Sequence, residues 1–551
     1  MTRSISRHSV CAAPIAKPRS NHAPSPSDST GHPFPGEVKK SPPWGTAGTS
    51  GKSRSVIAYP HSLLQNRLLH RKRNCVKLPG RQRNPKEPAR KNRCSRSHSI
   101  WSLGSIPFGV GLLGIACSQP LPNIEPEDMR IASFSDANES MDSSHVSDLL
   151  MTPDLARPET PMYLNGSFDG GSSPFRTWLG AIDFAREIKR TYGKRLPITF
   201  FLTTAFLDKS VMGSSVGTAK SQEEILVRTA LIQQAVNEGH EIANHTVRHL
   251  DGGDDGGKWT LSQWRTELLE FQRQVTRNVY QPVLDDSGAP VFPRWQPLPT
   301  ATPHTAGASC SDVNPCSSGL SCVYVTKSVG LCTQDCNGDL ACPSGLYCGY
   351  PDTTGTTLEF KDICLPLPQF PVVYKGQTLF RSDGTPNLSN PLLRPYRVVG
   401  FRAPYLSTND AMYDALKELG YEYDSSDVAP PEPAQIKNGI FQFALMKMPG
   451  MVTYPMDYSY YIRDTDRATM TADYRSGIVQ AYKLSRMPWN IGHHLRNYKD
   501  GVYFEAMKDA FRFAAQGCPD DKNMGRPQCP NLELISFREL AQRLAPPSPT
   551  P

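Results

Sequence analysis

Between residues 160 and 420, apolar positions follow two alternating patterns along the chain. Short runs of β-branched and aromatic residues, such as residues 198–202, have the composition of buried strands. Between these runs, apolar residues spaced three or four apart, such as Trp178, Ile182 and Ala185, place one apolar face on a helix. The pattern predicts strands at residues 162–169, 198–204, 241–243 and 398–401, and helices at residues 178–190, 225–236, 261–275 and 410–419. Strands that alternate with helices indicate a parallel sheet, either open or closed into a barrel.

Four polar residues follow predicted strands. Asp169 ends the first strand, His245 and His249 follow the third, and Arg402 follows the fourth. Because functional groups of parallel α/β folds gather at the carboxyl ends of the strands, we expect these four side chains to share a cleft. Two imidazoles four residues apart can reach one divalent cation if the backbone turns between them, and neutral imidazole suits zinc. The spacing alone also fits a histidine pair on a surface turn, so the metal hypothesis depends on the neighbouring motifs.

The charge of the chain is divided unevenly. Residues 1–100 carry a net charge of +17 and the remainder carries −9, which gives the whole chain +8. The basic part is a leader, residues 1–99, that is rich in Pro, Ser and Arg and lacks the periodicity of helices or strands. A basic tail can bind nucleic acid. We favour an unstructured leader that is not part of the translated protein, and we expect no nucleic-acid partner.

An export signal follows the leader. Basic residues precede a short, Gly-rich apolar run at residues 100–116, which is too short for a secure membrane span and ends at Cys117. The ending Leu-Leu-Gly-Ile-Ala-Cys resembles a bacterial lipoprotein signal, in which Cys117 would become the lipidated N-terminus and the membrane anchor. Secretion with cleavage nearby and without a lipid is the alternative. Both interpretations place the protein in the cell envelope or outside the cell, with residues 118–159 as a linker.

Eight of the fourteen cysteines lie between Cys310 and Cys364, in an internal repeat. The residues around them are mainly Gly, Asp, Asn, Pro and Ser, so this segment has too few aliphatic side chains for a core of its own. An even number of cysteines in an exported protein predicts disulfide bonds. Zinc binding is the alternative, but it would favour cysteine pairs two to four residues apart together with several histidines, and His304 is the only histidine nearby and lies outside the repeat. The spacing leaves the connectivity open. Cys518 and Cys529 predict a separate disulfide near the C-terminus.

The cysteine module interrupts a domain that continues after it. The alternation of strands and helices resumes beyond the cysteines, so both parts belong to one α/β domain. We predict that this domain comprises residues 160–303 and 367–545, with a disulfide-rich insertion at residues 304–366 and a disordered tail at residues 546–551.

Five short motifs occur in order along the two parts of this domain. They are Ser-Phe-Asp-Gly at residues 167–170, Gly-His-Glu-Ile-x-Asn-His-Thr-x-x-His at 239–249, Gly-Phe-Arg-Ala-Pro-Tyr at 400–405, Tyr-x-Tyr-Asp-Ser-Ser at 421–426 and Ile-Gly-His-His at 491–494. The set resembles the polysaccharide deacetylase family, which is also called NodB-like or carbohydrate esterase family 4. The resemblance implies a distorted (β/α) barrel of the NodB-like type. It also implies metal-dependent removal of N- or O-acetyl groups from polysaccharides such as chitin or peptidoglycan.

The resemblance assigns expected roles to the motif residues. His245 and His249 would hold a divalent metal, for which zinc suits the ligands. The metal would polarise the acetyl carbonyl and lower the pKa of a bound water. Asp169 would be the general base, and His494 the general acid that protonates the leaving amine or alkoxide. His493 is the alternative general acid.

Three further residues complete the expected site. Arg402 would orient Asp169 and keep it ionised, and the backbone N–H of Tyr405 would stabilise the developing oxyanion. Asp424 would support His494 or line the cleft. Each of the three also has an ordinary structural explanation, as an ion pair, a packed aromatic ring or a turn cap. Their combination favours a site.

The sequence departs from the family at one position. The usual first motif has two consecutive aspartates, a base and a metal ligand, whereas Asp169 is followed by Gly170. Three protein ligands are the norm for catalytic zinc. Either Asp169 itself binds the metal, or Asp457 supplies the third carboxylate, or the protein binds carbohydrate or a surface without catalysis. We predict an active deacetylase for an acetylated cell-wall or extracellular glycan, with non-catalytic binding as the alternative.

Overall fold

The computed structural model describes the chain from residue 161 to residue 545, with short gaps. The predicted leader, the export signal with Cys117, the linker and the C-terminal tail lie outside the described residues. The described ranges are 161–171, 174–219, 221–336, 341–349, 362–484, 486–496, 498–520, 522 and 525–545.

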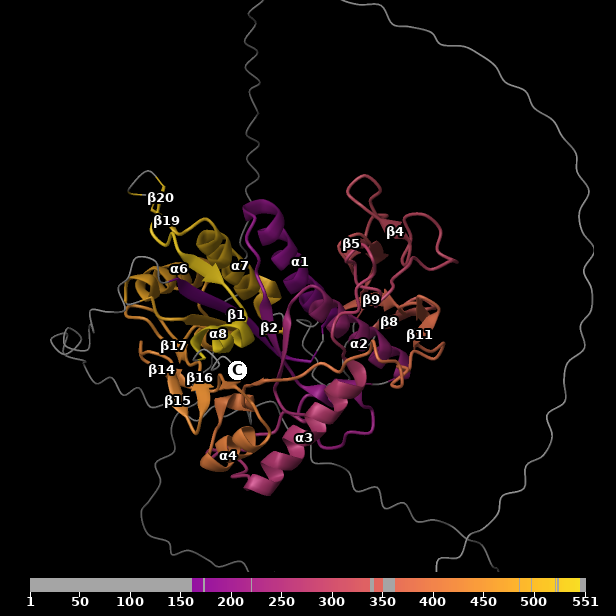
Figure 1. Ribbon diagram of the computed structural model, residues 1–551. Coiled ribbons are helices and arrows are strands. Elements are labelled where there is room, and N and C mark those ends of the chain that lie inside the picture. Colours follow the sequence, from indigo (N-terminus) through magenta and orange to yellow (C-terminus); the bar gives the residue numbers. More distant parts are fainter. Residues whose placement is uncertain are drawn as a thin grey trace, which may run out of the picture. The chain divides into compact units, whose positions relative to one another are not determined.

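Within these ranges, one nine-stranded sheet organises the α/β domain (Figure 1). Its strands follow the order β15-β16-β13-β12-β3-β2-β1-β18, and β21 pairs with the start of β1. The pairings between these strands are parallel except for that of β15 with β16, which is antiparallel. The strands are β1 (Met162–Gly170), β2 (Ile198–Leu202), β3 (Glu241–Asn244), β12 (Gly400–Phe401), β13 (Tyr423–Asp424), β15 (Gln435–Lys437), β16 (Ile440–Gln442), β18 (Trp489–His494) and β21 (Leu532–Leu534). The α/β class predicted from the sequence is confirmed.

The central strands are buried on both faces. Every residue of β2 is buried. In β1, apolar side chains such as Leu164 and Phe168 join the main core, whereas the alternate positions Asn165, Ser167 and Asp169 are polar and also buried. A strand with polar side chains on a buried face lines the interior of a barrel rather than a solvent surface. This alternation brings Asp169 to the carboxyl end of β1, on the polar face.

Helices supply the other half of the apolar core. Trp178 of α1 and Trp264 of α3 are fully buried in the cluster that contains the apolar face of β1. The longer helices are α1 (Phe175–Tyr192), α2 (Gln222–Asn237), α3 (Leu261–Asn278), α4 (Asp410–Glu418), α6 (Arg467–Lys483), α7 (Val502–Ala515) and α8 (Phe537–Leu544). The shorter ones are η3 (Thr204–Leu207), η4 (Pro404–Leu406), α5 (Asp457–Tyr461) and η5 (Tyr498–Gly501). Helices α1 to α4 confirm the four predicted helices, and α6 to α8 lie beyond the predicted set.

The sheet curls into an incomplete barrel, with a gap between β18 and the segment that follows β16. Side chains bridge this gap: Asn490 Nδ2 donates to the carbonyl oxygen of Ala444 at 2.9 Å, and Trp489 Nε1 donates to that of Met446 at 3.0 Å. The bridged segment pairs separately, as β14 (Val428–Ala429) with β17 (Leu445–Met446). The distorted barrel expected from the family resemblance is therefore confirmed as a curled half-barrel.

The disulfide-rich insertion consists of two repeated units, and its strands lie beside α1 and α2 in Figure 1. Each unit is a three-stranded sheet with two disulfides, which join its first cysteine to its third and its second to its fourth. The first unit has β4 (Ser309–Cys310), β5 (Ser321–Tyr324) and β6 (Gly330–Thr333) with bonds Cys310–Cys322 and Cys316–Cys332. The second has β7 (Asp335–Cys336), β8 (Leu346–Cys348) and β9 (Asp362–Pro366) with bonds Cys336–Cys348 and Cys342–Cys364. The predicted disulfides are confirmed, and the zinc alternative for these cysteines is wrong because their sulfurs are paired.

Shorter hairpins complete the described chain. Strands β10 (Val372–Tyr374) and β11 (Gln377–Phe380) follow the insertion, and β19 (Pro519–Asp520) pairs with β20 (Arg526–Pro527). Cys518 and Cys529 form the separate disulfide that the sequence predicts. The disulfides indicate an oxidising, extracytoplasmic compartment. Among the described helices, none combines the length and the apolar character needed to cross a bilayer.

Candidate active site

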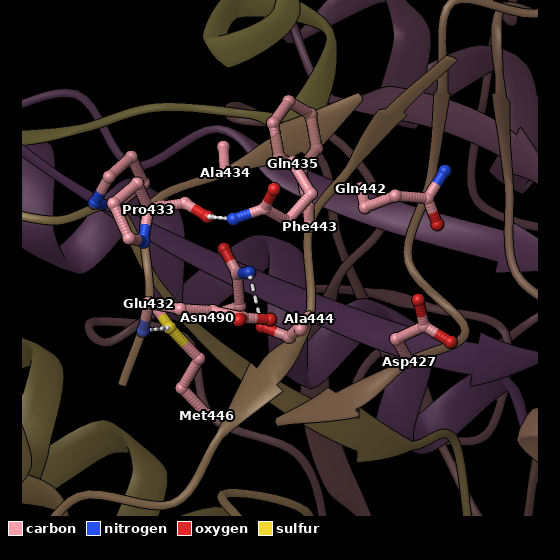
Figure 2. A pocket seen from close by; sticks show the side chains of 11 residues that line it. Asp427, Glu432, Pro433, Ala434, Gln435, Gln442, Phe443, Ala444, Met446 and Asn490 are labelled. Carbon is pink, nitrogen blue, oxygen red and sulfur yellow. Dashed lines mark hydrogen bonds between the residues drawn. The ribbon is translucent and has the colours of Figure 1, made fainter. Parts of the chain in front are cut away.

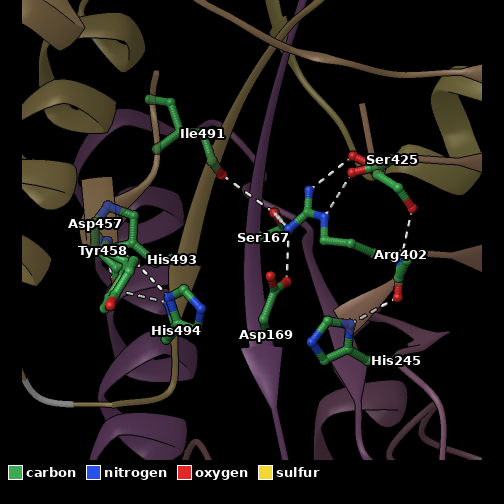
Figure 3. A network of polar contacts seen from close by, with 12 residues as sticks. Ser167, Asp169, His245, Arg402, Ser425, Asp457, Tyr458, Ile491, His493 and His494 are labelled. Atoms are coloured by element: carbon green, nitrogen blue, oxygen red, sulfur yellow. Dashed lines mark hydrogen bonds and ion pairs between the residues drawn. The ribbon is translucent and has the colours of Figure 1, made fainter. Parts of the chain in front are cut away.

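A buried ion pair forms the centre of the candidate site (Figure 3). Arg402, which follows β12, places Nη1 at 2.7 Å from Oδ1 of Asp169 at the end of β1. The side chain of Arg402 is 0% exposed and that of Asp169 is 3% exposed. Because β1 and β12 are separated by β2 and β3 in the sheet, the long arginine side chain spans the interior of the curled sheet to reach the carboxylate. The pairing that the sequence predicts for these two residues is present.

The guanidinium of Arg402 is satisfied on all sides. Its Nη1 also donates to Ser167 Oγ at 3.0 Å, Nε donates to the carbonyl oxygen of Ser425 at 3.0 Å, and Nη2 donates to Ser425 Oγ at 2.8 Å. The ring of Phe201 lies 4.1 Å from its central carbon, in a cation–π contact. A buried charge is tolerated only when it is paired and hydrogen-bonded, and this set of contacts meets that need. Arg402 is therefore fixed, and it fixes the orientation of Asp169.

His245 leaves one ring nitrogen free. Its Nδ1 lies 2.8 Å from the carbonyl oxygen of Arg402, which can only accept, so Nδ1 carries the proton and Nε2 keeps its lone pair. Burial lowers the pKa of His245, against the opposing effect of Asp169, so the ring is neutral near neutral pH. A neutral imidazole whose other nitrogen donates to a backbone carbonyl is the usual form of a metal-binding histidine.

His249 lies on a tight turn that brings its ring 4.9 Å from the ring of His245, between centroids. Thr246 and His249 both have positive φ, at 64° and 54°. The backbone N–H of His249 donates to Thr246 Oγ1 at 3.0 Å, which holds this turn. Burial lowers the pKa of His249 well below its usual value, and the neighbouring His245 adds to the effect. The predicted histidine pair is therefore neutral and convergent.

The histidine pair fits a metal ion in donor chemistry but supplies only two ligands. Among the described residues, the cysteines of the insertion are the only groups that place three potential ligand atoms within 4.8 Å of one another, and those cysteines form disulfides. Asp169 faces Arg402 through Oδ1. Gly170 has no side chain and adopts a φ of 125°. The third ligand of the family motif has no replacement within this distance of the two imidazoles.

On the opposite side of Asp169, His494 is bound to Asp457 (Figure 3). The Nδ1 of His494 lies 2.7 Å from Asp457 Oδ1, and the backbone N–H of His494 donates to Asp457 Oδ2 at 2.8 Å. Burial alone would lower the pKa of His494, but the carboxylate of Asp457 outweighs it and raises the pKa above its usual value. His494 therefore holds a proton more firmly than an isolated histidine, as a general acid must. Both oxygens of Asp457 are occupied by this task, and Figure 3 shows Asp457 beyond His494, away from His245.

The neighbouring His493 points to the other face of β18. Its side chain is 1% exposed, and its Nε2 lies 3.2 Å from the hydroxyl of Tyr474 on α6. Burial lowers the pKa of His493 to about 4. A buried, neutral histidine that packs against a helix cannot readily supply a proton to a substrate. These features favour His494 over His493 as the acid.

Tyr405 borders the site on the side of the histidine pair. Its ring centroid lies 5.0 Å from that of His249, and its side chain is 44% exposed. Tyr405 has a φ of 58°, so the backbone turns sharply in η4. The carbonyl and amide groups around it are paired, but its own backbone N–H has no hydrogen-bond acceptor among the described residues. An unpaired N–H at the edge of the cleft is what an oxyanion donor requires.

Asp424 supports the segment that leads to Tyr405, through Ser426 and Ala403, rather than contacting His494. Its Oδ1 accepts from Ser426 Oγ at 2.5 Å, and Ser426 Oγ accepts in turn from the backbone N–H of Ala403 at 2.8 Å. The hydroxyl of Tyr413 donates to Asp424 Oδ2 at 3.3 Å. Burial raises the pKa of Asp424 to about 7. The structure thus places Asp424 beneath the segment that leads to Tyr405.

Some residues of the site are not among the catalytic and metal-binding residues expected from the sequence. Ser167 bridges Arg402 to β18, since its hydroxyl donates to the carbonyl oxygen of Ile491 at 3.4 Å. Two tyrosine rings flank His494, Tyr458 at 6.2 Å and Tyr498 at 5.8 Å between centroids. Ser167 could have been found from the two-residue period of β1, because it shares a face with Asp169. Tyr498 gives no such signal.

A pocket of about 40 Å³ lies at the gap of the barrel, between residues 442–446 and Asn490 of β18 (Figure 2). It is lined by polar groups of Asn490, Gln442 and Asp427, among others. A water molecule needs roughly 10–15 Å³ of such space. The pocket can therefore hold a few waters but not a sugar residue. None of the predicted catalytic or metal-binding residues lines it.

The fold and the site together define a class of protein: a distorted (β/α) barrel with a convergent histidine pair, an Asp–Arg pair and an Asp–His pair at the carboxyl ends of its strands. Residues 192–283, which include His245 and His249, match the family model described as polysaccharide deacetylase. Over these residues the chain is similar to the polysaccharide deacetylase family. The order of the five motifs along the chain agrees with this similarity.

Solved structures of low sequence identity were also found. A putative polysaccharide deacetylase from Mycobacterium smegmatis is 12% identical, with 72% of this chain and 96% of that chain covered and a TM-score of 0.35. A family 4 carbohydrate esterase from Streptomyces lividans in complex with acetate is 9% identical, with 66% and 96% covered and a TM-score of 0.26. PuuE allantoinase is 10% identical, with 72% and 95% covered and a TM-score of 0.35. In the comparison with curated proteins, none matches the chain.

Proposed function

We propose that this protein is an exported, metal-dependent hydrolase that removes acetyl groups from a cell-wall or extracellular polysaccharide, by cleavage of an amide or an ester bond. One observation carries the proposal: the Asp169–Arg402 pair lies between the histidine pair and His494, whose pKa is raised by Asp457 (Figure 3). A base that lies beside a metal-binding pair, with an acid on the other side of the base, supplies the groups that acyl hydrolysis requires.

His245 and His249 would hold the divalent metal, and zinc suits their neutral imidazoles best. When bound, such an ion supplies Lewis-acid polarisation of the acetyl carbonyl and lowers the pKa of a bound water. The protein prepares both rings for this task, since His245 is fixed by the carbonyl oxygen of Arg402 and His249 by its turn. Water or substrate oxygens would complete the coordination, because the described residues offer no third ligand.

Asp169 would take the proton of the attacking water. One of its oxygens is bound to Arg402, and its second oxygen, Oδ2, makes no hydrogen bond among the described residues. Oδ2 is therefore free to accept a proton, while Arg402 keeps the carboxylate in a single orientation. A positioned base of this kind typically contributes ~10²–10⁴-fold to the rate.

His494 would protonate the leaving amine or alkoxide. Its Nδ1 is bound to Asp457, so its Nε2 is the atom available to the substrate. The side chain of His494 is 27% exposed, which allows contact with a substrate, whereas that of Asp457 is 2% exposed. The backbone N–H of Tyr405 would stabilise the negative charge on the acetyl oxygen.

The site of action follows from the family and from the disulfides. An acetylated glycan outside the cytoplasm is the substrate that a disulfide-bonded member of this family would meet. Attachment to a membrane through a lipid on Cys117 would hold the enzyme in the cell envelope, and release without the lipid would make it a secreted protein. The Cys117→Ala variant separates the two, because it leaves the membrane fraction only if the lipid is the anchor.

A second function is favoured by one specific observation. The position that holds a metal ligand after the first aspartate of the family motif is Gly170, and the described residues offer two histidines, without a third protein ligand close to them. A protein of this family that cannot bind the metal would bind carbohydrate or a surface without catalysis.

Acetate release by the purified protein, with zinc and other divalent ions added, tests the proposal across N- and O-acetylated glycans. We expect release from at least one polymer, and we expect Asp169→Asn to reduce it by ~10²–10⁴-fold. The matched control is Asp466→Asn, which keeps a good helix cap on α6 because Asn caps as well as Asp. A protein that binds no metal and releases no acetate from any polymer is not the proposed enzyme, and binding without catalysis then stands.

A further inference from the structure

The disulfide-rich insertion supplies a cap to the helix that follows the candidate base. Helix α1 begins six residues after Asp169, and its N-cap residue, Pro174, has no side chain that can cap it. Its first turn also has no acidic residue. Asp362 of the insertion takes this place, since its Oδ1 accepts from the backbone N–H of Arg176 at 3.1 Å. Free N–H groups at a helix start require such an acceptor.

Asp362 is held rigidly by the insertion. It opens β9, which pairs with β7 on one side and with β8 on the other. Two disulfides, Cys336–Cys348 and Cys342–Cys364, tie these strands together. Asp362 is 0% exposed, and its Oδ1 also accepts from the backbone N–H of Ile363 at 2.8 Å. The capping carboxylate therefore cannot move without the second disulfide unit.

A second contact connects the insertion to the turn after Asp169. The carbonyl oxygen of Gly349, next to Cys348, accepts a hydrogen bond from Nη2 of Arg228 on α2. Arg228 is fully buried, and its central carbon lies 5.2 Å from the ring of Phe175 and 5.1 Å from the ring of Phe206. The ring of Phe206 packs directly on Gly171, where a Cβ atom would meet it at 1.9 Å.

The second disulfide unit has a small apolar cluster of its own, formed by Cys336, Leu346 and Cys364, and it also contributes side chains to the core of the barrel. Ile363 and Leu365 of β9 are fully buried, and they belong to the main apolar cluster of the barrel. Arg176 of α1 also pairs with Asp335 of β7. The second disulfide unit is thus packed against the start of α1 as part of the barrel rather than attached as a separate module.

We infer that the second disulfide unit is a positioning element for the candidate base: Asp362 caps α1, and Gly349 and Arg228 fix Phe206 against Gly171, so that the peptides next to Asp169 keep one conformation. This inference rests on the proposed deacetylase function for its catalytic consequence. Its structural part is independent of activity. Asp362 touches neither the metal-binding histidines nor His494, and it acts only through the chain that leaves Asp169.

The test compares Asp362→Ala with Asp362→Asn in the purified protein. Alanine removes the cap, whereas asparagine keeps it, because Oδ1 makes both hydrogen bonds and Oδ2 has no partner to lose. Hydrogen–deuterium exchange is followed in peptides that cover residues 164–171 and the first turn of α1. Ser536→Ala is the control, since it removes the cap of α8 elsewhere in the domain.

For Asp362→Ala we expect about fivefold faster exchange at Gly170, Gly171 and the start of α1, the change expected from the loss of one helix cap. We expect kcat to fall by about 5- to 100-fold with KM unchanged, because small displacements of a catalytic group reduce the rate rather than binding. Asp362→Asn restores both values, and Ser536→Ala changes exchange only in α8.

Unchanged exchange in Asp362→Ala would overturn the inference, whether or not the protein is an enzyme. Faster exchange with an unchanged kcat would overturn its catalytic consequence. Faster exchange throughout the domain of Asp362→Ala would show that this variant is generally destabilised. In that case Asp362→Asn decides the test: exchange like that of the wild type supports the inference, and any other result overturns it. A wild-type protein that releases no acetate contradicts the proposed function alone, because the exchange experiment still decides whether the insertion orders the turn.

Discussion

The two sides of the candidate site use the same residue type with pKa shifts in opposite directions. His245 on one side and His494 on the other both have Nδ1 engaged at close range, at 2.8 Å and 2.7 Å. The partner of His245 is a neutral carbonyl oxygen, and burial then lowers its pKa. The partner of His494 is the carboxylate of Asp457, which reverses the effect of burial and raises the pKa. The carboxylate partner of His494 thus gives this histidine a pKa shift opposite to that of His245, which suits the acid and the metal ligand that we propose.

The largest effect is expected from His245→Gln, which removes one of the two histidines that we propose as metal ligands. The affinity for the metal should fall by more than about 100-fold, because the loss of a residue that only supports a ligand already costs up to that much. Elemental analysis of the protein after dialysis measures the metal that remains bound. Acetate release should fall with the metal content. His304→Gln, which changes an exposed histidine of the insertion, serves as the control. If His245→Gln keeps all of its metal, His245 is not a metal ligand.

On the acid side, His494→Asn should lower kcat by ~10²–10⁴-fold without changing the metal content. The loss should be much smaller with 4-nitrophenyl acetate, because nitrophenolate leaves without a proton from the enzyme. Equal losses with the natural glycan and with the nitrophenyl ester would contradict the role of His494 as an acid. Loss of metal in His494→Asn would contradict the assignment of metal binding to the side of His245 alone.

The dependence of kcat on pH, measured in the wild type and in Asp457→Asn, tests whether Asp457 raises the pKa of His494. The acid must be protonated, so activity is lost as the pH rises through the pKa of His494. Since the carboxylate raises this pKa, its removal should move the alkaline limb of kcat to lower pH. The same raised pKa stabilises the folded protein below the unfolded value of about 6.5, and this stability is lost as the pH rises through the folded value. Thermal unfolding at several pH values measures it, and Asp466→Asn should leave both profiles in place.

The smallest effect concerns the missing ligand, and Gly170→Asp tests it directly. A φ of 125° is unfavourable for any residue with a side chain, although a Cβ atom would meet Leu495 only at an ordinary distance of 3.7 Å. We expect a loss of roughly 1–3 kcal/mol in the free energy of unfolding, measured with denaturant. If Gly170→Asp binds the metal more tightly than the wild type despite this loss of stability, the two histidines without a carboxylate form the weaker metal site. An unchanged stability would mean that the turn adopts another conformation.

The sequence predicts the shared cleft because a simple rule governs it. Asp169, His245, His249 and Arg402 all follow strands, and parallel strands end at the same edge of a sheet. The alternation of apolar and polar residues in β1 also identifies which face carries Asp169. The cysteine repeat predicts disulfides for a similar reason, since residues of this composition cannot build a core.

Other features depend on contacts between segments far apart in the chain. The free Nε2 of His245 follows from the carbonyl oxygen of Arg402, which is 157 positions away. The cap on α1 comes from Asp362, which is 186 positions from Arg176. The sequence predicts that Asp424 supports His494 or lines the cleft, whereas in the structure its carboxylate accepts hydrogen bonds from the hydroxyls of Ser426 and Tyr413. No local pattern reveals such partners, because each is chosen by the packing of the whole domain.

The adjacent positions of His493 and His494 have a consequence for what insertions and deletions the protein can tolerate. The two rings point to opposite faces of β18, and its pairing with β1 places His494 opposite Asp169. A slip of this strand by one residue would exchange the two rings, moving a neutral ring into the cleft and the proton donor into the helix layer. The backbone N–H of Gly492 donates to the carbonyl oxygen of Pro455 at 2.8 Å, which fixes the alignment from the side of Asp457. A change of one residue in chain length just before β18 would thus remove the acid while leaving every amino acid of the site in the sequence.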